Sequence, residues 1–448
     1  MQNGNSSNHQ APLDFEVVPE EGLRNEHIQL VLGTPINQVL AALKNASRVI
    51  RNVELIYCNK EPFAREITLI LKNDGIRLTF DPKQQVLKLI EVYDFKNLSL
   101  HYCNTTFSTP EQAADVSKVE SCFGATHPGV YDEKLKTYLL HWRGVSFSFP
   151  AKEPSTVHQS YAHGLGSLNF SNSSLPLLER MGIYCGDSPN EVKVPEVPAS
   201  IHCGNPFGLH ITSVCDEFGI TGLQLQFCAE EFGQSPRKTS ELPQKERVLS
   251  FGDSEQEVLA ALGAPSRVFY KSEDKMLIQR GSSSESIGNP DKPDVFFNYF
   301  TLGLDVLLDA EKRTVIKFVL HTNLPGHYDF GEYVRASFAV QCSSGQGPFS
   351  SGEPSTIFTH SKLEDFKAAF ADPETGICNP VVVNRASAND GENPFGSTFC
   401  YGNDQLIVEV LDNGHIATLT VYESTGGDST TTESASESTE AEEADEDY

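Results

Sequence analysis

The feature that most limits how this chain can fold is a short segment that occurs twice, a strand-like run followed at once by a helix. Residues 248–265 read VLSFGDSEQEVLAALGAP, in which Ser254 and Glu257 have the spacing of a capping box and apolar residues follow at helical intervals. Residues 28–43 read IQLVLGTPINQVLAAL, with Thr34 in the N-cap position before a proline. The sequence therefore predicts the same strand and helix in two places.

Alternating apolar runs around a glycine follow each helix, and they predict β-hairpins or meanders with one buried face. The two clearest are residues 67–95 and 295–323, and shorter examples follow at 119–150 and at 363–376 with 397–422. In the last of these, Asn413-Gly414 is a strong two-residue hairpin turn. Helix-stop-hairpin segments are also common in unrelated α+β proteins, so convergence is the alternative to a repeat. Either interpretation predicts an α+β fold of tandem helix-plus-antiparallel-sheet units with weak internal repeats.

The repeats and the low-complexity stretches between them suggest a domain organisation for the 448 residues. The predicted parts are a disordered N-terminus (1–12), a first α+β unit (13–110), a second unit with an irregular, loop-rich extension (111–246), a third α+β unit (247–342) with a mobile insertion (277–294), a flexible linker (343–356), a last α+β unit (357–423) and a disordered acidic tail (424–448).

The formal net charge of −27 argues against a nucleic-acid partner, because phosphate binding requires clustered Lys and Arg. The N-terminal residues lack the basic and apolar regions of a signal peptide, and no apolar run is long enough to span a membrane. We therefore expect a soluble, cytoplasmic protein.

Standard catalytic and nucleotide-binding motifs are missing from the sequence: neither G-x-S-x-G, nor a P-loop, nor H-E-x-x-H occurs. We expect no cofactor. One charged stretch, Lys271, Glu273, Asp274 and Lys275, has the composition of an exposed segment; binding of a protein partner, of phosphate or of an acidic peptide is the functional alternative.

Residues 321–330, HTNLPGHYDF, place two histidines and an aspartate around a Pro-Gly turn. His321, His327 and Asp329 are residue types that bind zinc or act in hydrolysis, but a metal site needs three or four converging ligands. A strand exit followed by a turn, with Tyr328 and Phe330 packing, explains the same residues structurally. We rank a partner-binding or turn-stabilising role for His321, His327 and Tyr328 above catalysis.

Several long runs, in order, resemble those of the phagosome assembly factor family: FGATHPGVY (123–131), RGVSFSF (143–149), FYKSEDKM (269–276), FFNYFTLGLDVLLDA (296–310), KFVLHTNLPGHYDF (317–330) and NPFGSTFCYG (393–402). The resemblance implies a non-enzymatic autophagy regulator without known catalytic residues. It further implies a complex with a WD-repeat β-propeller partner, recruitment to the site where autophagosomes form, and contact with phosphoinositide-containing membranes mainly through the propeller.

Two other functions stay open at this point. A membrane-trafficking factor at Golgi or endosomal membranes predicts the same fold with a localisation that ignores nutrient state. A metal-dependent or hydrolytic enzyme would use the 321–330 loop.

Overall fold

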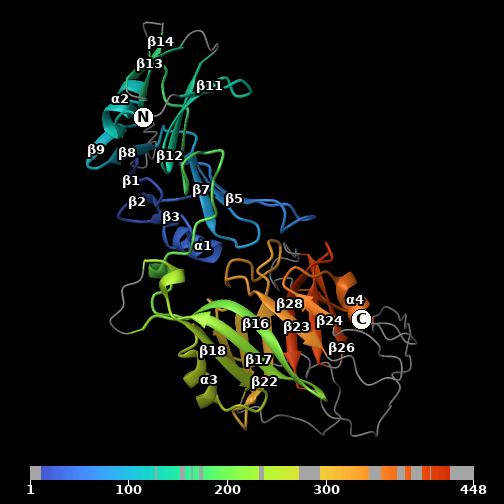
Figure 1. The fold of residues 1–448 in the computed structure, drawn as a ribbon. Helices are drawn as coiled ribbons and strands as arrows, with labels where there is room; N and C mark the ends of the chain where they lie inside the picture. The colour runs from blue at the N-terminus through green and yellow to red at the C-terminus, as the bar shows by residue number, and fades with distance from the viewer. Residues whose placement is uncertain are drawn as a thin grey trace, which may run out of the picture.

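Strands dominate the computed structural model, which describes residues 12–126, 129–151, 157–162, 165–170, 175–231, 237–271, 293–342, 355–370, 379–384, 396–403 and 405–423. Four large sheets, in which nearly every strand pair is antiparallel, form two lobes joined by residues 185–206 (Figure 1). Lobe one comprises residues 13–184 and lobe two residues 207–422. The predicted segments 1–12, 277–294, 343–356 and 424–448 lie wholly or mostly outside the described residues.

Lobe one contains a five-stranded and an eight-stranded sheet that share one apolar core. The five-stranded sheet has the order β3 (Gln29–Val31), β2 (Gly22–Arg24), β1 (Leu13–Val18), β8 (Leu98–Tyr102), β9 (Thr105–Ser108). The eight-stranded sheet has the order β10 (Val130–Asp132), β11 (Thr137–Trp142), β12 (Val145–Pro150), β15 (Arg180–Tyr184), β7 (Leu87–Val92), β6 (Ile76–Phe80), β5 (Ile67–Leu71), β4 (Val53–Ile56). A separate hairpin pairs β13 (Val157–Ala162) with β14 (Leu165–Phe170).

Lobe two repeats this arrangement around a second core. Its five-stranded sheet has the order β18 (Gln244–Ser250), β17 (Gly219–Cys228), β16 (Phe207–Asp216), β23 (Phe338–Cys342), β24 (Ser355–Phe358). Its eight-stranded sheet has the order β19 (Arg267–Tyr270), β20 (Val295–Tyr299), β21 (Leu304–Leu308), β22 (Val315–His321), β28 (Ile416–Tyr422), β27 (Leu406–Val410), β26 (Ser397–Asn403), β25 (Val381–Asn384).

The described residues include four α-helices, and two short 3-10 helices lie between and beside the lobes. They are α1 (Ile36–Asn45), α2 (Val116–Phe123), α3 (Glu255–Leu262), α4 (Leu363–Phe370), η2 (Ala199–Ile201) and η3 (Thr239–Glu241). The predicted capping box of α3 is confirmed, since the Ser254 side chain accepts from the Glu257 backbone while the Glu257 carboxylate accepts from the Ser254 backbone. Helix α1 begins one residue later than its sequence suggests, with Pro35 rather than Thr34 as the N-cap.

The predicted α+β class is wrong, because the chain is mostly β. Each α-helix of the described residues has only eight to ten residues, whereas 28 strands form the sheets in the same part of the chain. Alternation of apolar and polar residues predicts strands such as β5, in which Ile67, Leu69 and Leu71 are buried. The long strands β16 and β17 lack that signal, because most side chains of β16 are half-buried on both faces. Sequence periodicity therefore underestimates the strand content.

Strand order shows that the two lobes are copies of one design. Elements β1 to β3, α1, β4 to β9, α2, β10 to β12 and β15 correspond in order and pairing to β16 to β18, α3, β19 to β24, α4 and β25 to β28, with the β13–β14 hairpin as an insertion. The correspondence between the lobes includes individual hydrogen bonds. The Gly75 carbonyl in lobe one accepts from the Tyr93 N–H at 2.8 Å, and the Gly303 carbonyl in lobe two accepts from the His321 N–H at 2.9 Å. Tyr93 and His321 thus hold equivalent places.

The predicted boundaries of the four units remain a prediction. In the structure, β16 and β17 pair with β18 and β23, so residues from 207 onward belong to the sheets of lobe two.

Candidate functional site

The 321–330 loop leaves β22 and runs into the junction between the lobes. His321 is the last residue of β22, and the connection to β23 extends to residue 337, whereas the equivalent connection in lobe one spans only residues 93–97. Phe330 in this loop packs against the core of lobe one. The loop that sequence analysis singled out therefore belongs to the contact between the two lobes.

His321 lies between two carboxylates. Its Nδ1 is 2.8 Å from Asp329 Oδ2 and its Nε2 is 3.1 Å from Asp305 Oδ2, with all three side chains buried. Burial by itself lowers the pKa of His321, but the hydrogen bonds and charges of Asp305 and Asp329 outweigh it and raise the pKa to about 9. A ring with an acceptor at each nitrogen is an imidazolium, which donates both hydrogen bonds.

His327 extends this group into what we call the charged cluster: His321, His327, Asp305, Asp329 and Glu409. Its Nδ1 contacts Asp329 Oδ1, and its Nε2 is 3.3 Å from Glu409 Oε1 on β27, two strands from β22 in the sheet. Burial lowers the pKa of His327, and the hydrogen bonds and charges of Asp329 and Glu409 raise it by more. Asp329 thus bonds both imidazoles, and although burial raises its pKa, these two partners lower it to about 2.

Tyr333 covers the cluster from one side. Its ring stacks on the His321 imidazole with 3.7 Å between the centroids, and its hydroxyl donates to Asp305 Oδ1 at 2.9 Å. The Asn298 amide also donates to Asp305, at 2.8 Å. Burial, followed by the charge of Asp305, raises the pKa of the Tyr333 phenol, so the tyrosine stays neutral and donates.

The cluster is arranged for stability rather than for reaction. Each imidazole and carboxylate in it is at most 7% exposed, and its polar atoms face one another instead of a cavity. Within the described part of the chain, no group of three or more His, Cys, Asp or Glu side chains has the arrangement of a metal site. Groups that are already paired and shielded from water have no position at which a substrate can meet them.

Two residues after His321, the loop contacts lobe one directly. The Asn323 amide donates to Gln85 Oε1 at 2.7 Å, and the Gln85 amide donates back to the Asn323 carbonyl at 2.8 Å. Asn323 Oδ1 in turn accepts from the Gly331 N–H at 2.8 Å. Both amides are 2% exposed, so their bonds across the junction are shielded from competing water.

Arg335 makes a second crossing, from lobe two to the β6–β7 turn of lobe one. Its Nη1 donates to the carbonyls of Pro82 at 2.6 Å and Lys83 at 2.9 Å, while Nε donates to Thr322 at 2.8 Å within its own lobe. The guanidinium carbon lies 4.5 Å from the centroid of the Phe63 ring. Burial lowers the pKa of Arg335 to about 9, which still leaves it charged at neutral pH. We call Gln85, Asn323 and Arg335 the interlobe latch.

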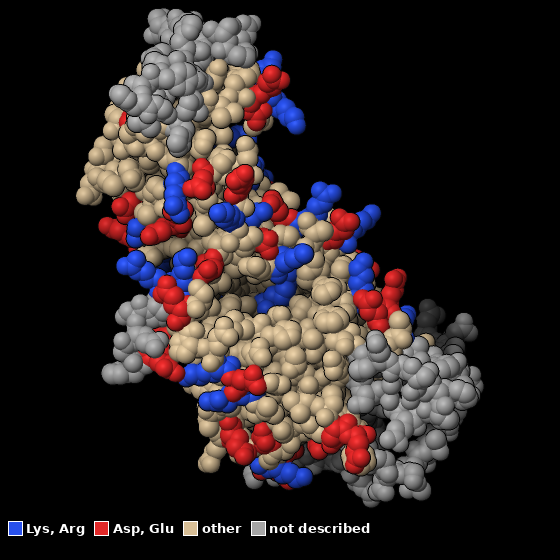
Figure 2. Space-filling model, viewed as in Figure 1, with Lys and Arg blue, Asp and Glu red and all other residues tan. Residues whose placement is uncertain are grey.

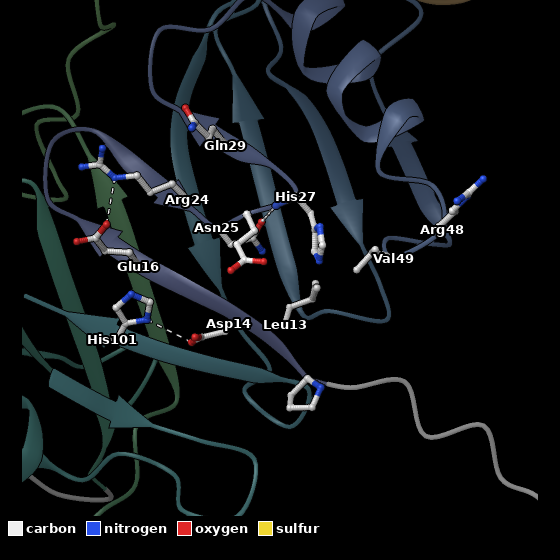
Figure 3. Close-up of a pocket in the computed structure, with 12 residues that line it drawn as sticks. Leu13, Asp14, Glu16, Arg24, Asn25, His27, Gln29, Arg48, Val49 and His101 are labelled. Carbon is white, nitrogen blue, oxygen red and sulfur yellow. Dashed lines mark hydrogen bonds and ion pairs between the residues drawn. The ribbon is translucent and has the colours of Figure 1, made fainter. Parts of the chain in front are cut away.

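Among the concave surfaces that the described residues form outside the charged cluster, two exceed 700 Å³. One is a hollow of about 710 Å³ at the junction, beside Arg335, which we call the junction hollow. The other is a basin of about 830 Å³ over the five-stranded sheet of lobe one (Figure 3). Glu16 pairs with Arg24 at 3.4 Å and Asp14 with His101 at 3.2 Å, so these four side chains of the basin satisfy one another. Figure 3 draws both contacts.

The residues predicted to bind a partner lie in different environments. His321 is 4% and His327 1% exposed, whereas Tyr328 is 47% exposed at the surface of the loop. Lys271 is exposed at the end of β19. Glu273, Asp274 and Lys275 lie outside the described residues. Of the predicted set, Tyr328 and Lys271 are thus available for direct contact, and the two histidines are not.

Sequence reasoning missed the partners that give the histidines their role. These residues are Asp305, Glu409, Tyr333, Asn298, Gln85 and Arg335. One signal was available: Arg77 and Tyr93 of lobe one, which form a cation–π contact at 5.4 Å, occupy the places that Asp305 and His321 hold in lobe two. When the two repeats are aligned position by position, Asp305 aligns with Arg77 and His321 with Tyr93. The alignment therefore indicates that Asp305 and His321 contact each other, as Arg77 and Tyr93 do.

Comparisons with known proteins place the chain among relatives from animals and plants. The family model described as Phagosome assembly factor 1 matches residues 26–422. A PHAF1 protein of Drosophila melanogaster is 40% identical over 423 residues, covering 92% of this chain and 94% of the relative. PHAF1 proteins of Caenorhabditis elegans and Arabidopsis thaliana are 39% and 31% identical, covering 91% and 88% of this chain and 94% and 90% of their own lengths.

No solved structure matches the chain. None of the helices in the described residues has the length and apolar character needed to cross a bilayer. The family model and the relatives cover nearly the whole length of both lobes, and this chain belongs to the phagosome assembly factor 1 family.

Proposed function

We propose that this protein is a non-enzymatic adaptor in autophagosome assembly. In this role it acts in the cytoplasm in a complex with a WD-repeat β-propeller protein, and it is recruited with that partner to the site where autophagosomes form. Membership of a phagosome assembly factor family supports the assembly role. The propeller partner and the site of action are expectations that come from the family resemblance.

The observation that carries the proposal is the role of the residues that sequence analysis identified as candidate catalytic groups. His321, His327 and Asp329 are buried and bonded to one another or to Asp305 and Glu409, and the same loop bridges the lobes through Asn323. Residues that would serve a hydrolase thus fix the conformation of a loop whose Asn323 contacts the other lobe. A fixed pair of lobes presents one extended surface of constant shape, which suits an adaptor because little conformational entropy is lost on binding.

We further propose that Tyr328 takes part in the partner contact, because its large ring is 47% exposed on a loop held in place by the charged cluster. Lys271 is a second candidate from the same lobe. The contact with phosphoinositide-containing membranes is indirect in this proposal, since a net charge of −27 disfavours direct approach to anionic lipid.

Proximity labelling with this chain as bait, in fed and starved cells, tests the proposal. The proposal predicts a WD-repeat propeller protein among the labelled neighbours and, on starvation, labelling of proteins of the forming autophagosome. Tyr328→Ala should weaken recovery of the propeller, whereas Tyr93→Ala, at the place in lobe one equivalent to His321, should not. Labelling of Golgi or endosomal proteins that is indifferent to starvation would favour the trafficking alternative and contradict the proposal.

A further inference from the structure

The junction hollow combines apolar walls with a positive charge. The apolar side chains come from both lobes, with Phe63 and Val86 on lobe one and Phe207 and Val334 on lobe two. Its volume of about 710 Å³ falls in the range of pockets that enclose small organic ligands, roughly 300–1,000 Å³. An apolar lining of this size can bury the body of a ligand.

The charged residues that line the hollow are all potential cations. They are Lys83, Arg335 and His360, and none of the described lining residues is acidic. This contrasts with the whole chain, which has 61 Asp and Glu against 34 Lys and Arg. In Figure 2, Lys and Arg atoms are recessed at the level where the two lobes meet. The local field in the hollow therefore favours an anion.

One donor atom of the Arg335 guanidinium lacks a hydrogen-bond acceptor among the described residues. Its Nε and Nη1 bond to backbone carbonyls, and its buried Nη2 has no hydrogen-bond partner among the described residues. Within those residues no carboxylate forms an ion pair with the guanidinium, although Asp81 acts on it from a distance. A buried cationic donor that lacks an acceptor is unfavourable. Because Nη2 is itself shielded from solvent, an anionic group in the hollow would compensate the guanidinium through its charge rather than through a hydrogen bond to Nη2.

We propose that the junction hollow is a binding site for a small soluble amphipathic anion, a molecule with a carboxylate or phosphate group on an apolar body. The anionic group lies toward Arg335, with Lys83 and His360 at the rim, and the body packs against Phe63 and Val334. Because the walls belong to different lobes, a bound ligand also ties the lobes together. The site does not depend on the propeller partner or on autophagy.

The test uses the full chain and three amphiphiles that share a decyl chain, all kept below their micelle concentrations: decyl phosphate, decyltrimethylammonium and decyl maltoside. Native mass spectrometry counts bound molecules, and isothermal titration calorimetry gives affinities. We expect one decyl phosphate per chain, and binding of the cationic and neutral amphiphiles that is at least about tenfold weaker, as the loss of one charge-assisted hydrogen bond implies.

The matched variants change side-chain charges and keep the backbone carbonyl of residue 83 that accepts from Arg335. Lys83→Glu with His360→Glu changes two exposed rim residues and should weaken decyl phosphate binding by about tenfold or more. Lys312→Glu, on the equivalent turn of lobe two and outside the hollow, should leave binding unchanged. Circular dichroism of each variant checks that it is folded.

Equal binding of the three amphiphiles, or an affinity for decyl phosphate that the double variant keeps, would overturn the proposal. A second contradicting result concerns a synthetic 424–448 peptide. If this peptide binds saturably through Lys83 and His360 while decyl phosphate fails to bind, the occupant of the hollow is the acidic tail of this chain. Flotation with phosphatidic acid vesicles that needs the same two residues, again without binding of free decyl phosphate, would make the surface a membrane contact and also refute a soluble ligand.

Discussion

Asn323 and Gln85 lie 238 positions apart in the chain, and their side chains hydrogen-bond each other across the junction of the two lobes at 2.7 Å. Both residues have positive φ angles, 48° for Asn323 and 55° for Gln85, and both amides are buried. Arg313 occupies the place of Gln85 in lobe two and has the same φ of 55°. The backbone at this position is thus common to both repeats, and in lobe one it also carries the interlobe contact.

Stability should depend on pH through His321. The folded pKa of about 9 exceeds the ordinary value of 6.5, so the stabilisation is complete below pH 6.5 and is lost as the pH rises through 9. Between these values, we expect the free energy of unfolding of the unaltered protein to fall by up to about 3 kcal/mol relative to His321→Gln. Urea titrations at a series of pH values measure this difference. His27→Gln, on an exposed histidine, should behave as the unaltered protein does; a pH-independent difference for His321→Gln would contradict the imidazolium assignment.

Asp329 should control the protonation of both histidines, because among the described residues it is the one carboxylate that contacts each of them. Replacing it by Asn keeps the shape and removes the charge. In Asp329→Asn, we expect the pKa values of His321 and His327 to move down toward the ordinary range, by about one unit or more for loss of an opposite charge at this separation. Histidine ring signals followed by NMR report this directly. Ring signals that titrate alike in both proteins would mean that Asp305 and Glu409 suffice.

Arg335→Ala should loosen the lobes without unfolding either core. The change removes two hydrogen bonds to lobe one and the contact with Phe63, and bonds of this charged kind contribute about 1.5–3 kcal/mol each. We expect faster hydrogen exchange at the β6–β7 turn and a larger radius of gyration in X-ray scattering. Arg143→Ala, whose side chain is 73% exposed, is the control and should change neither. A compact Arg335→Ala protein with native exchange would show that the guanidinium is dispensable.

Metal removal should have no effect on the fold. Since His321 and His327 bond to carboxylates and no metal-binding arrangement occurs in the described residues, dialysis against a chelator should leave the melting temperature unchanged. His327→Ala should likewise leave the metal content of the purified protein, measured by plasma mass spectrometry, as it was. Stoichiometric zinc in the unaltered protein that is lost in this variant would support the alternative of a metal-dependent enzyme.

Local sequence signals predicted local structure. The alternating runs at 67–95 and 295–323 became β5 to β7 and β20 to β22, and the Ser254 capping box starts α3. Such features can be predicted from the sequence because each depends on residues a few positions apart. The same reasoning overestimated the helical character, because a strong capping signal says nothing about how short the helix is relative to the sheets.

The role of the 321–330 loop could not be predicted from the sequence, because it depends on residues far apart in the chain. His321 meets Asp305 only because β21 and β22 pair in one register, and His327 meets Glu409 only because β27 and β28 close the sheet beside them. Gln85 comes from the other lobe. A histidine-rich turn looks the same in sequence whether carboxylates from distant strands surround it or a substrate does.

The most direct test of the claim that this loop is a structural connection between the lobes is a double-mutant cycle on Gln85→Ala and Asn323→Ala. The strain of placing Ala at two positive φ angles cancels in the cycle, which leaves the interaction of the two side chains. Unfolding free energies of the four proteins in urea should give a coupling of about 1–2 kcal/mol, as expected for a buried pair of hydrogen bonds. A coupling within error of zero would contradict the claim, because the two lobes would then be held together without a contribution from this buried pair.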